Sequence, residues 1–306
     1  MRITLNMQTN EALLTLNNQQ EQITNLSQQI ASGVTLSSPS DDPYDWAQAM
    51  NINQGLQEYN SVLSGINFAT GWGQATGSAL SQLSNLVSQA QQTAISAASA
   101  TGTTQSATLA SEVNGILQQA VNLANSQYGD QYIFAGASTT SAPYSMDNLT
   151  GNNDSNYIQV KTGTSDASGG GSTAVNLTGN DVFSFTSGGN TLNVLQVISG
   201  LGQAIQNGDS ATISNDIDTL NDAYNHITNE SAVNGSMLSA LTNQQSAINV
   251  MQTNEQSTLS KLQDTDVAEA TTKLQQAQTA FQAALQVTGM LDNLNLPSYL
   301  TSSSTT

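Results

Sequence analysis

The chain has 306 residues, of which 8% are charged and 37% are hydrophobic, and 22 acidic against four basic side chains give a net charge of −18. So few Lys and Arg side chains argue strongly against nucleic acid as a partner, and the negative charge disfavours anionic membrane surfaces. The absence of cysteine excludes disulfides and thiolate metal sites. With so little apolar surface, the chain must bury it along long helical seams or against neighbouring copies.

The sequence contains no segment that predicts membrane insertion. No run reaches the ~18 apolar residues of a membrane span. The first sixteen residues lack the apolar stretch of a signal peptide. These two observations fit a cytoplasmic protein, and they fit equally a protein that is exported by a route without a signal peptide.

A heptad pattern predicts the first helix, which we expect to end at Gly33. Its apolar stripe consists of Ala12, Leu16, Ile23, Leu26 and Ile30. A loop with two prolines follows. Asp42 is well placed to cap the next helix, with Pro43 at the first helical position and Asp45 in the first turn.

Two further stripes extend from Ala49 to Ile66 and from Leu80 to Ala97. Gly71, Gly73 and Gly77 lie between them, where we expect a kink in one long helix. Another helix is predicted over residues 104–127.

The composition changes at Tyr128, and residues 128–191 are predicted to form an inserted β domain. This segment is rich in Gly, Asn, Ser and Thr, which favour turns. Four short runs are predicted as strands: they are residues 132–134, 157–160, 175–177 and 182–185.

Helix returns at about Leu192 and is interrupted near Gly208. A long heptad pattern then extends to Leu262, with polar residues such as Asn234, Gln245 and Gln252 in its register. Polar core positions weaken a coiled coil but can fix its register. The last helix carries an apolar stripe from Val267 to Leu291 and is predicted to end before Pro297.

These elements predict a mainly α fold in which paired N- and C-terminal coiled-coil helices form a rod with an inserted β domain. Residues 1–42 are expected to pair with residues 264–300, because neither stripe can bury its seam alone. Residues 43–127 and 192–263 make a helical rod domain, and residues 301–306 a disordered tail. The seam residues that we expect to serve as the assembly interface are Leu16, Ile23, Leu26, Ile30, Leu274, Phe281 and Leu291.

No convergent set of catalytic side chains is found, so no catalytic, cofactor or metal residue is predicted. His226 is the only histidine and is interpreted as a surface residue. Asp41 and Asp42 are better explained by capping than by general acid–base catalysis. The acidic loop from Asp147 to Asp154 lacks the Glu of an EF-hand.

Three segments have a pattern in common with one protein family. They are residues 1–50 with Gln29–Gly33 and Pro39–Pro43, the block from Ala124-Asn125 to Tyr132–Gly136, and residues 266–300 with the ending Leu296-x-x-Tyr299-Leu300. They resemble the flagellin family, and more closely its branch of hook–filament junction proteins. Flagellin itself tends to have Ala, not Pro, after the paired aspartates.

The resemblance implies a flagellin-like fold and a structural ring of identical subunits that links the hook to the filament. It implies hook-associated protein 1 and flagellin as partners, together with an export chaperone that holds the C-terminal helix. It also implies an extracellular location after type III export without a cleaved signal peptide. Two alternatives are a minor flagellin, and a secreted adhesin on a helical stalk. An enzyme is disfavoured.

Overall fold

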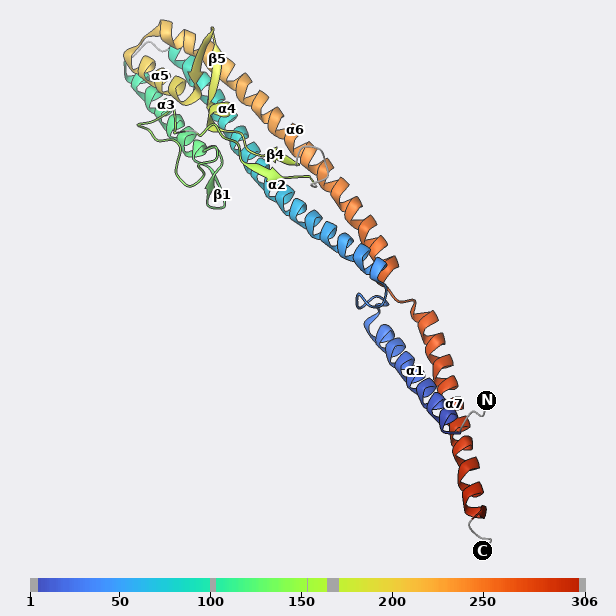
Figure 1. Cartoon of the computed structure of the whole chain (residues 1–306). Helices are drawn as coiled ribbons and strands as arrows, with labels where there is room; N and C mark the ends of the chain where they lie inside the picture. Colours follow the sequence, from blue (N-terminus) through green and yellow to red (C-terminus); the bar gives the residue numbers. More distant parts are fainter. Residues whose placement is uncertain (1–4, 100–102, 153, 164–170, 303–306) are drawn as a thin grey trace. The chain divides into compact units, whose positions relative to one another are not determined.

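The computed structural model describes residues 5–99, 103–152, 154–163 and 171–302 (Figure 1). Side chains are described for Met7 and, within these ranges, from Asn10 to Met290. The chain divides into two compact units, one formed by residues 1–56 with 253–306 and the other by residues 57–252. The fold is mainly helical with small antiparallel ribbons inserted between the helices, as the sequence predicts.

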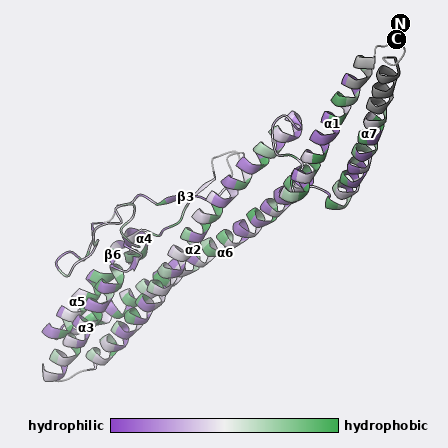
Figure 2. Cartoon of the chain, turned by 90° about the horizontal axis from the view of Figure 1, so that it is seen from below, coloured by the Kyte–Doolittle hydropathy of each residue, from purple (hydrophilic) through white to green (hydrophobic). Residues whose placement is uncertain are grey.

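In the first unit, α1 (Leu5–Ser32) packs along α7 (Val267–Ser302) (Figures 1 and 2). The expected pairing of the terminal helices is therefore confirmed. The first helix ends where the sequence predicts, because Gly33 has a φ of 73° and its N–H donates to the Gln29 carbonyl at 2.9 Å.

The last helix does not end before Pro297, as the sequence predicts, but continues to Ser302. A proline inside a helix removes one hydrogen bond and crowds the carbonyl four residues earlier. It does not forbid helical backbone on both sides, so the prediction was wrong. Of the predicted tail, residues 301 and 302 are helical, and residues 303–306 lie outside the described part of the chain.

Two interruptions of the helices meet at a joint, residues 33–42 and 264–266. The Thr35 N–H donates to the Gln263 carbonyl at 2.7 Å, and the Thr265 N–H donates to the Gly33 carbonyl at 2.9 Å. The hydroxyls of Thr35 and Thr265 lie 2.9 Å apart. The two crossings of the chain are thus hydrogen-bonded to each other.

The paired aspartates of the joint have structural roles. Asp42 Oδ1 accepts the N–H groups of Tyr44 at 2.9 Å and Asp45 at 3.0 Å, which confirms it as the cap of α2 (Pro43–Ala98). Asp41 accepts the N–H groups of Ser38 and Ser37, and these backbone hydrogen bonds lower the pKa of the Asp41 carboxyl. Both carboxylates are therefore accounted for without catalysis.

The second unit contains most of α2 and α6 (Ser210–Gln263), together with α3 (Thr103–Ala124) and α5 (Val194–Asn207). Its main core is formed by large side chains that are fully buried: they include Trp72, Leu80, Leu83, Leu195, Ile198 and Leu220. The stop at Gly208 is confirmed, since this residue has a φ of 67° and caps α5.

The glycines of α2 do not separate two helices. The helix is uninterrupted from Pro43 to Ala98, as one long helix requires, and a kink at these glycines stays a prediction. A Cβ atom on Gly71 would overlap the hydroxyl of Tyr128, and one on Gly73 would lie 2.8 Å from Leu238. These glycines therefore admit close neighbours.

Amide side chains connect α2 with α6. Gln252 donates to Asn60 Oδ1 at 3.0 Å, and seven residues away Gln245 donates to Asn67 Oδ1 at 2.8 Å. The buried Asn234 donates to the Gly73 carbonyl at 2.9 Å. The polar residues in the heptad register of α6 are thus hydrogen-bonded across the helix pair, which specifies one register.

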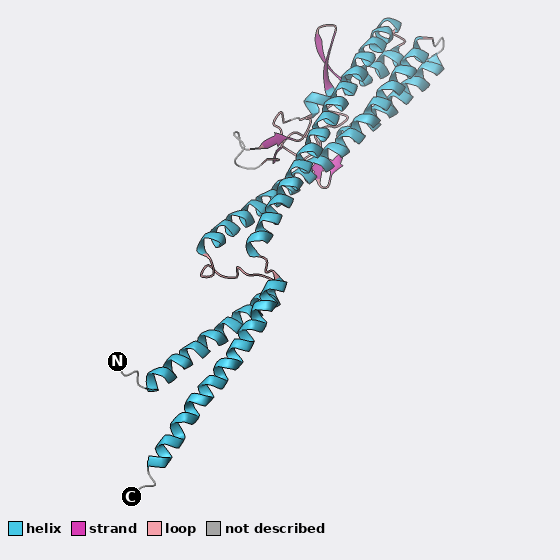
Figure 3. Ribbon diagram, turned by 90° about the vertical axis from the view of Figure 1, so that its right-hand side faces the viewer, coloured by secondary structure: helices cyan, strands magenta, loops and turns pink. Residues whose placement is uncertain are grey.

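Among its described residues, the inserted segment forms three two-stranded antiparallel ribbons (Figure 3). They are β1 (Gln127–Tyr128) with β2 (Gln131–Tyr132), β3 (Gln159–Lys161) with β4 (Ser172–Ala174), and β5 (Ser184–Ser187) with β6 (Asn190–Asn193). The last ribbon turns through Gly188 and Gly189, which both have positive φ, as in a type I′ turn.

Part of the strand prediction was wrong. Residues 175–177 form no strand, and residues 179–183 form a short helix, α4 (Gly179–Phe183). The helix is started by a capping box in which Thr178 Oγ1 accepts the Asp181 N–H and Asp181 accepts the Thr178 N–H. The segment also packs on the helices, because Phe134 and Phe183 belong to the main core and Val175 to a smaller core between α2 and α6.

Asn125 holds the entry to the inserted segment in place. Its Nδ2 donates to the Tyr144 carbonyl at 2.8 Å, and its Oδ1 accepts the Tyr144 N–H at 3.1 Å.

Asn125→Asp removes the donor and places a carboxylate against that carbonyl, so the free energy of unfolding should fall by about 1–3 kcal/mol. Urea denaturation tests this, with the exposed Asn122→Asp on α3 as the control. Equal stability of the two variants would contradict the role.

Candidate assembly interface

The predicted seam residues of α1 face the partner helix within the same chain. Leu16 and Leu26 are buried, while Ile23 and Ile30 are half-buried. Because α7 is the element that packs along α1, these side chains are covered first by α7.

The same holds for the predicted seam of α7. Leu274 and Phe281 are half-buried, and the buried Ala270 and Ala277 alternate with them along the same face. Small residues allow α1 to approach closely. The side chain of Leu291 lies outside the described residues. Six of the seven predicted interface residues therefore meet in one intrachain seam, and their contact with neighbouring subunits stays a prediction.

A second set of apolar side chains on the two helices is exposed, and the sequence analysis missed it. On α1, Leu14 is 64% exposed, and on α7, Met290 is 65% exposed. The other exposed members of this set, which we call the outer apolar residues, are Met7, Leu13, Leu285 and Val287. One signal was available: successive residues of a helix point about 100° apart, so Leu13, Leu14 and Leu16 cannot all face one partner.

The outer apolar residues of the two helices lie at the same level of the pair. Counting twenty residues back from Gly33 reaches Leu13, and counting twenty forward from Thr265 reaches Leu285. Gly33 and Thr265 are hydrogen-bonded at the joint, and both helices rise about 1.5 Å per residue. Exposed apolar groups at one level of a helix pair offer apolar area to a neighbouring helix.

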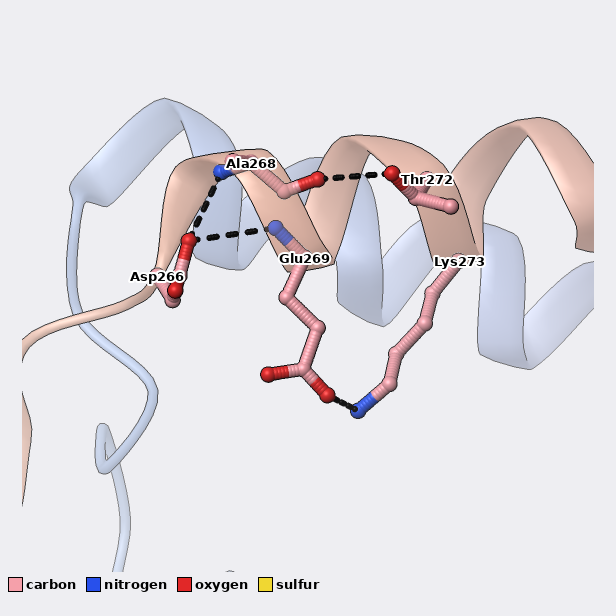
Figure 4. A network of polar contacts seen from close by, with 5 residues as sticks. All are labelled: Asp266, Ala268, Glu269, Thr272 and Lys273. Atoms are coloured by element: carbon pink, nitrogen blue, oxygen red, sulfur yellow. Dashed lines mark hydrogen bonds and ion pairs between the residues drawn. The ribbon is translucent and has the colours of Figure 1, made fainter.

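The surface around these residues has almost no charge. Glu11 and Glu21 are the only ionisable side chains of α1, and α7 has none between Lys273 and Met290. At the start of α7, Lys273 is paired with Glu269 at 2.8 Å (Figure 4). This surface therefore presents amide, hydroxyl and apolar groups to its surroundings, with few charges.

The start of α7 is fixed by its own hydrogen bonds. Asp266 Oδ1 accepts the N–H groups of Ala268 at 2.9 Å and Glu269 at 3.1 Å, and the Thr272 hydroxyl donates to the Ala268 carbonyl (Figure 4). Beyond this cap, a shallow groove of about 580 Å³ follows one face of α7. It is lined by Thr272, Gln275, Gln276, Thr279, Ala280 and Ala283. The short side chains of Thr279, Ala280 and Ala283 leave space there for those of a neighbour.

Other kinds of site find no support in the described residues. His226 is half-buried, not on the surface as predicted: its Nε2 lies 2.7 Å from the Asp181 carbonyl oxygen, and its ring stacks on Phe185. No group of three or more His, Asp or Glu side chains is placed to hold a metal ion in the described part. Within that part, no helix has the length and hydropathy needed to cross a membrane.

Comparison with known proteins identifies the family. The model of the bacterial flagellin N-terminal helical region matches residues 3–139, and that of the C-terminal helical region matches residues 217–300. Flagellar hook-associated protein 3 of Salmonella typhimurium is 33% identical over 153 residues, 49% of this chain and 48% of that protein. Its counterpart in Escherichia coli is 31% identical over 147 residues, 47% of this chain and 46% of that one. The matched part of the chain thus spans about half the length of these relatives.

Solved structures agree on the fold. A hook-associated protein from Vibrio parahaemolyticus superimposes with a TM-score of 0.64 at 15% identity, covering 73% of this chain and all of that one. The flagellar junction protein FlgL from Legionella pneumophila gives 0.56 at 16% identity, covering 71% of this chain and all of that one. Both helical regions that define bacterial flagellins are present here in the expected order, and the chain belongs to the flagellin family.

Proposed function

We propose that the chain is a structural junction protein of the bacterial flagellum, which links the hook to the flagellin filament by helix packing. Its partners would be hook-associated protein 1 on one side and flagellin on the other. The family and the curated relatives, both named hook-associated protein 3, support this role. The observation that carries it is the set of outer apolar residues on the α1–α7 pair. Its function is packing, and it is not an enzyme.

In this proposal, copies of the chain form a ring through their terminal helices. The α1–α7 seam holds each subunit together, while the outer apolar residues and the groove of α7 meet the helices of neighbours. The chain reaches the cell exterior through the flagellar export apparatus, and a chaperone holds the C-terminal helix until then.

A minor flagellin is the second candidate, because both matching family models describe flagellin regions. The purified protein would then polymerise alone into long filaments, whereas a junction protein would not. Membership of the flagellin family removes the reason for the adhesin alternative.

Substitution of the outer apolar residues tests the junction role. We expect Leu14→Gln and Leu285→Gln to change the free energy of unfolding of the monomer by no more than about 0.5 kcal/mol, since both positions are exposed. In cells that depend on the variant, filaments should fail to attach to the hook, and flagellin should appear in the medium. Electron microscopy of the hooks and immunoblots of the medium give the result.

Asn17→Ala on α1 and Gln282→Ala on α7 are matched controls, since they alter exposed polar positions of the same helices. Both controls should carry normal filaments. Secretion of each variant is measured separately, so that failure of export is not mistaken for failure of assembly. Normal filaments on cells with a secreted Leu14→Gln, Leu285→Gln double variant would sink the proposal.

A further inference from the structure

The core-facing positions of α6 follow a strict heptad in the second unit. One set of buried residues recurs every seven positions: it consists of Ile213, Leu220, Ile227, Asn234, Leu241 and Ile248. The second set begins three residues later: it consists of Asp216, Ala223, Glu230, Met237 and Gln244. Two carboxylates therefore occupy core positions of this helix, two heptads apart.

The first of them, Asp216, has no partner for one of its oxygens. Its Oδ2 is buried without a hydrogen bond among the described residues. α2 lies against this part of α6, because Gln91 donates to the carbonyl of the next residue, Ile217, at 3.5 Å. A buried carboxylate without a donor is unfavourable in its charged form. Burial raises the pKa of Asp216 to about 6, and the charge of Asp209 adds to the effect.

The surroundings of Asp216 supply no positive charge. α5 has no ionisable side chain, α2 has none beyond Tyr59, and α3 has only the exposed Glu112. The nearest ionisable groups along the chain are acidic: they are Asp209, which precedes α6, and Asp218 and Asp222 on α6. The only Lys or Arg of residues 57–252 is Lys161, which is paired with Glu58 at 2.7 Å.

The second core carboxylate, Glu230, is half-buried and responds in the same direction. Burial raises the pKa of Glu230, the nearby charge of Asp181 from α4 raises it further, and His226 one turn earlier opposes them. Tyr157 donates to Asp181 Oδ1 at 3.3 Å. Both carboxyls of the core face are therefore shifted in the same direction.

We propose that the helical bundle of the second unit is strengthened by mild acid, because protonation of Asp216 and Glu230 removes buried negative charge from the core face of α6. This inference does not depend on the junction role. A carboxyl whose pKa is higher in the fold than its unfolded value of about 3.9 binds its proton preferentially in the folded state. Stability is therefore gained as the pH falls from above 6 towards 4, and it is lost as the pH rises.

Few other interactions oppose this gain. The ion pairs among the described residues are Glu58–Lys161 and Glu269–Lys273, with exposed or half-exposed side chains, so protonation of their carboxylates loses little. The N–H and hydroxyl groups of Thr212 lower the pKa of Asp209, so this helix cap is lost only at a pH below the usual carboxyl range.

Thermal unfolding of the full chain against pH tests the proposal. The chain has two tryptophans, and a Trp46→Phe background leaves the fully buried Trp72 to report on the second unit alone. The Tm should rise by about 2–4 °C between pH 7.5 and pH 5. Asp216→Asn should have a higher Tm than the parent at pH 7.5 and less than half of the parent's rise.

Asp218→Asn is the matched control, since it removes the same charge from an exposed position of the same helix. It should keep the full rise. The rise should also persist in ~1 M salt, where the screening length is only about 3 Å, because salt does not restore hydration to a buried carboxylate. A flat or falling Tm in the parent, or equal flattening by Asp218→Asn, would overturn the proposal.

Discussion

Phe183→Ala is expected to lower the free energy of unfolding by about 3–5 kcal/mol. The side chain comes from α4 and is fully buried. Its ring centroid lies 5.5 Å from that of Phe134, in an edge-on arrangement, and 4.9 Å from that of Tyr144. Alanine would leave a cavity where the inserted segment meets the main core, and both ring contacts would be lost. Urea denaturation followed by circular dichroism measures the change.

Met146→Ala in the same segment provides the control, because this side chain is 47% exposed. It should alter stability by no more than about 0.5 kcal/mol. If Phe183→Ala were equally mild, the inserted segment would be an appendage that contributes little to the core.

Gly136→Ala should destabilise the protein by more than about 2 kcal/mol. The glycine has a φ of 65°, a conformation that costs other residues about 1–2 kcal/mol. A Cβ atom there would also overlap the backbone carbonyl of Asp154. The backbone of Asp154 cannot rotate away as a side chain could, so the two loop segments that carry Gly136 and Asp154 would have to move apart.

Gly129→Ala separates these two effects. This glycine has a similar φ of 60°, but a Cβ atom on it would meet nothing within 4 Å. Gly129→Ala should therefore lose only the free energy that the backbone conformation costs. The difference in the free energy of unfolding between the two variants, measured by urea denaturation, gives the cost of the contact with Asp154. Equal costs would show that the loop moves freely away from Gly136.

The helical part of the fold could be predicted because its signals are local. Gly33 and Gly208 end helices through a positive φ, and Asp42 caps α2 with its own side chain, so each boundary depends on a few adjacent residues. The heptads of α6 predicted one of its two core columns, which includes Leu220, Ile227 and Leu241, whereas the other column begins at Asp216 and was not predicted. The prediction at Pro297 was wrong because proline inside a helix raises the free energy of the helix but does not forbid it.

The inserted segment could not be predicted in the same way. Its strands are two to four residues long, too short for an alternating pattern to emerge. Two local signals were nevertheless present in the sequence and were not used in the prediction. The capping box of Thr178 indicates a helix start, and Gly188-Gly189 indicates a hairpin turn. The contact of Gly136 with the carbonyl of Asp154 joins residues 18 positions apart, and no local pattern encodes it.

The intrachain seam, unlike the contact with neighbouring subunits, could be compared with the structure. Heptad spacing identified Leu16, Leu26 and Leu274 as seam residues, and they lie in the seam of α1 with α7. The pattern does not say which partner covers a seam. Helical geometry alone shows that Leu13, Leu14 and Leu16 cannot all face one helix, but which of them are exposed became clear only once α7 was placed against α1.

The joint has a mechanical consequence. A linker made of one chain segment can rotate about its φ and ψ angles, and it therefore transmits almost no torque. Here the chain crosses the same level twice, at residues 33–42 and 264–266, and hydrogen bonds between Thr35 and Gln263 and between Thr265 and Gly33 tie the crossings together. Twisting one side of the joint against the other would have to break these bonds and wind two covalent strands around each other. If the chain serves as the proposed junction, this doubled crossing would carry torque that a single covalent connection could not.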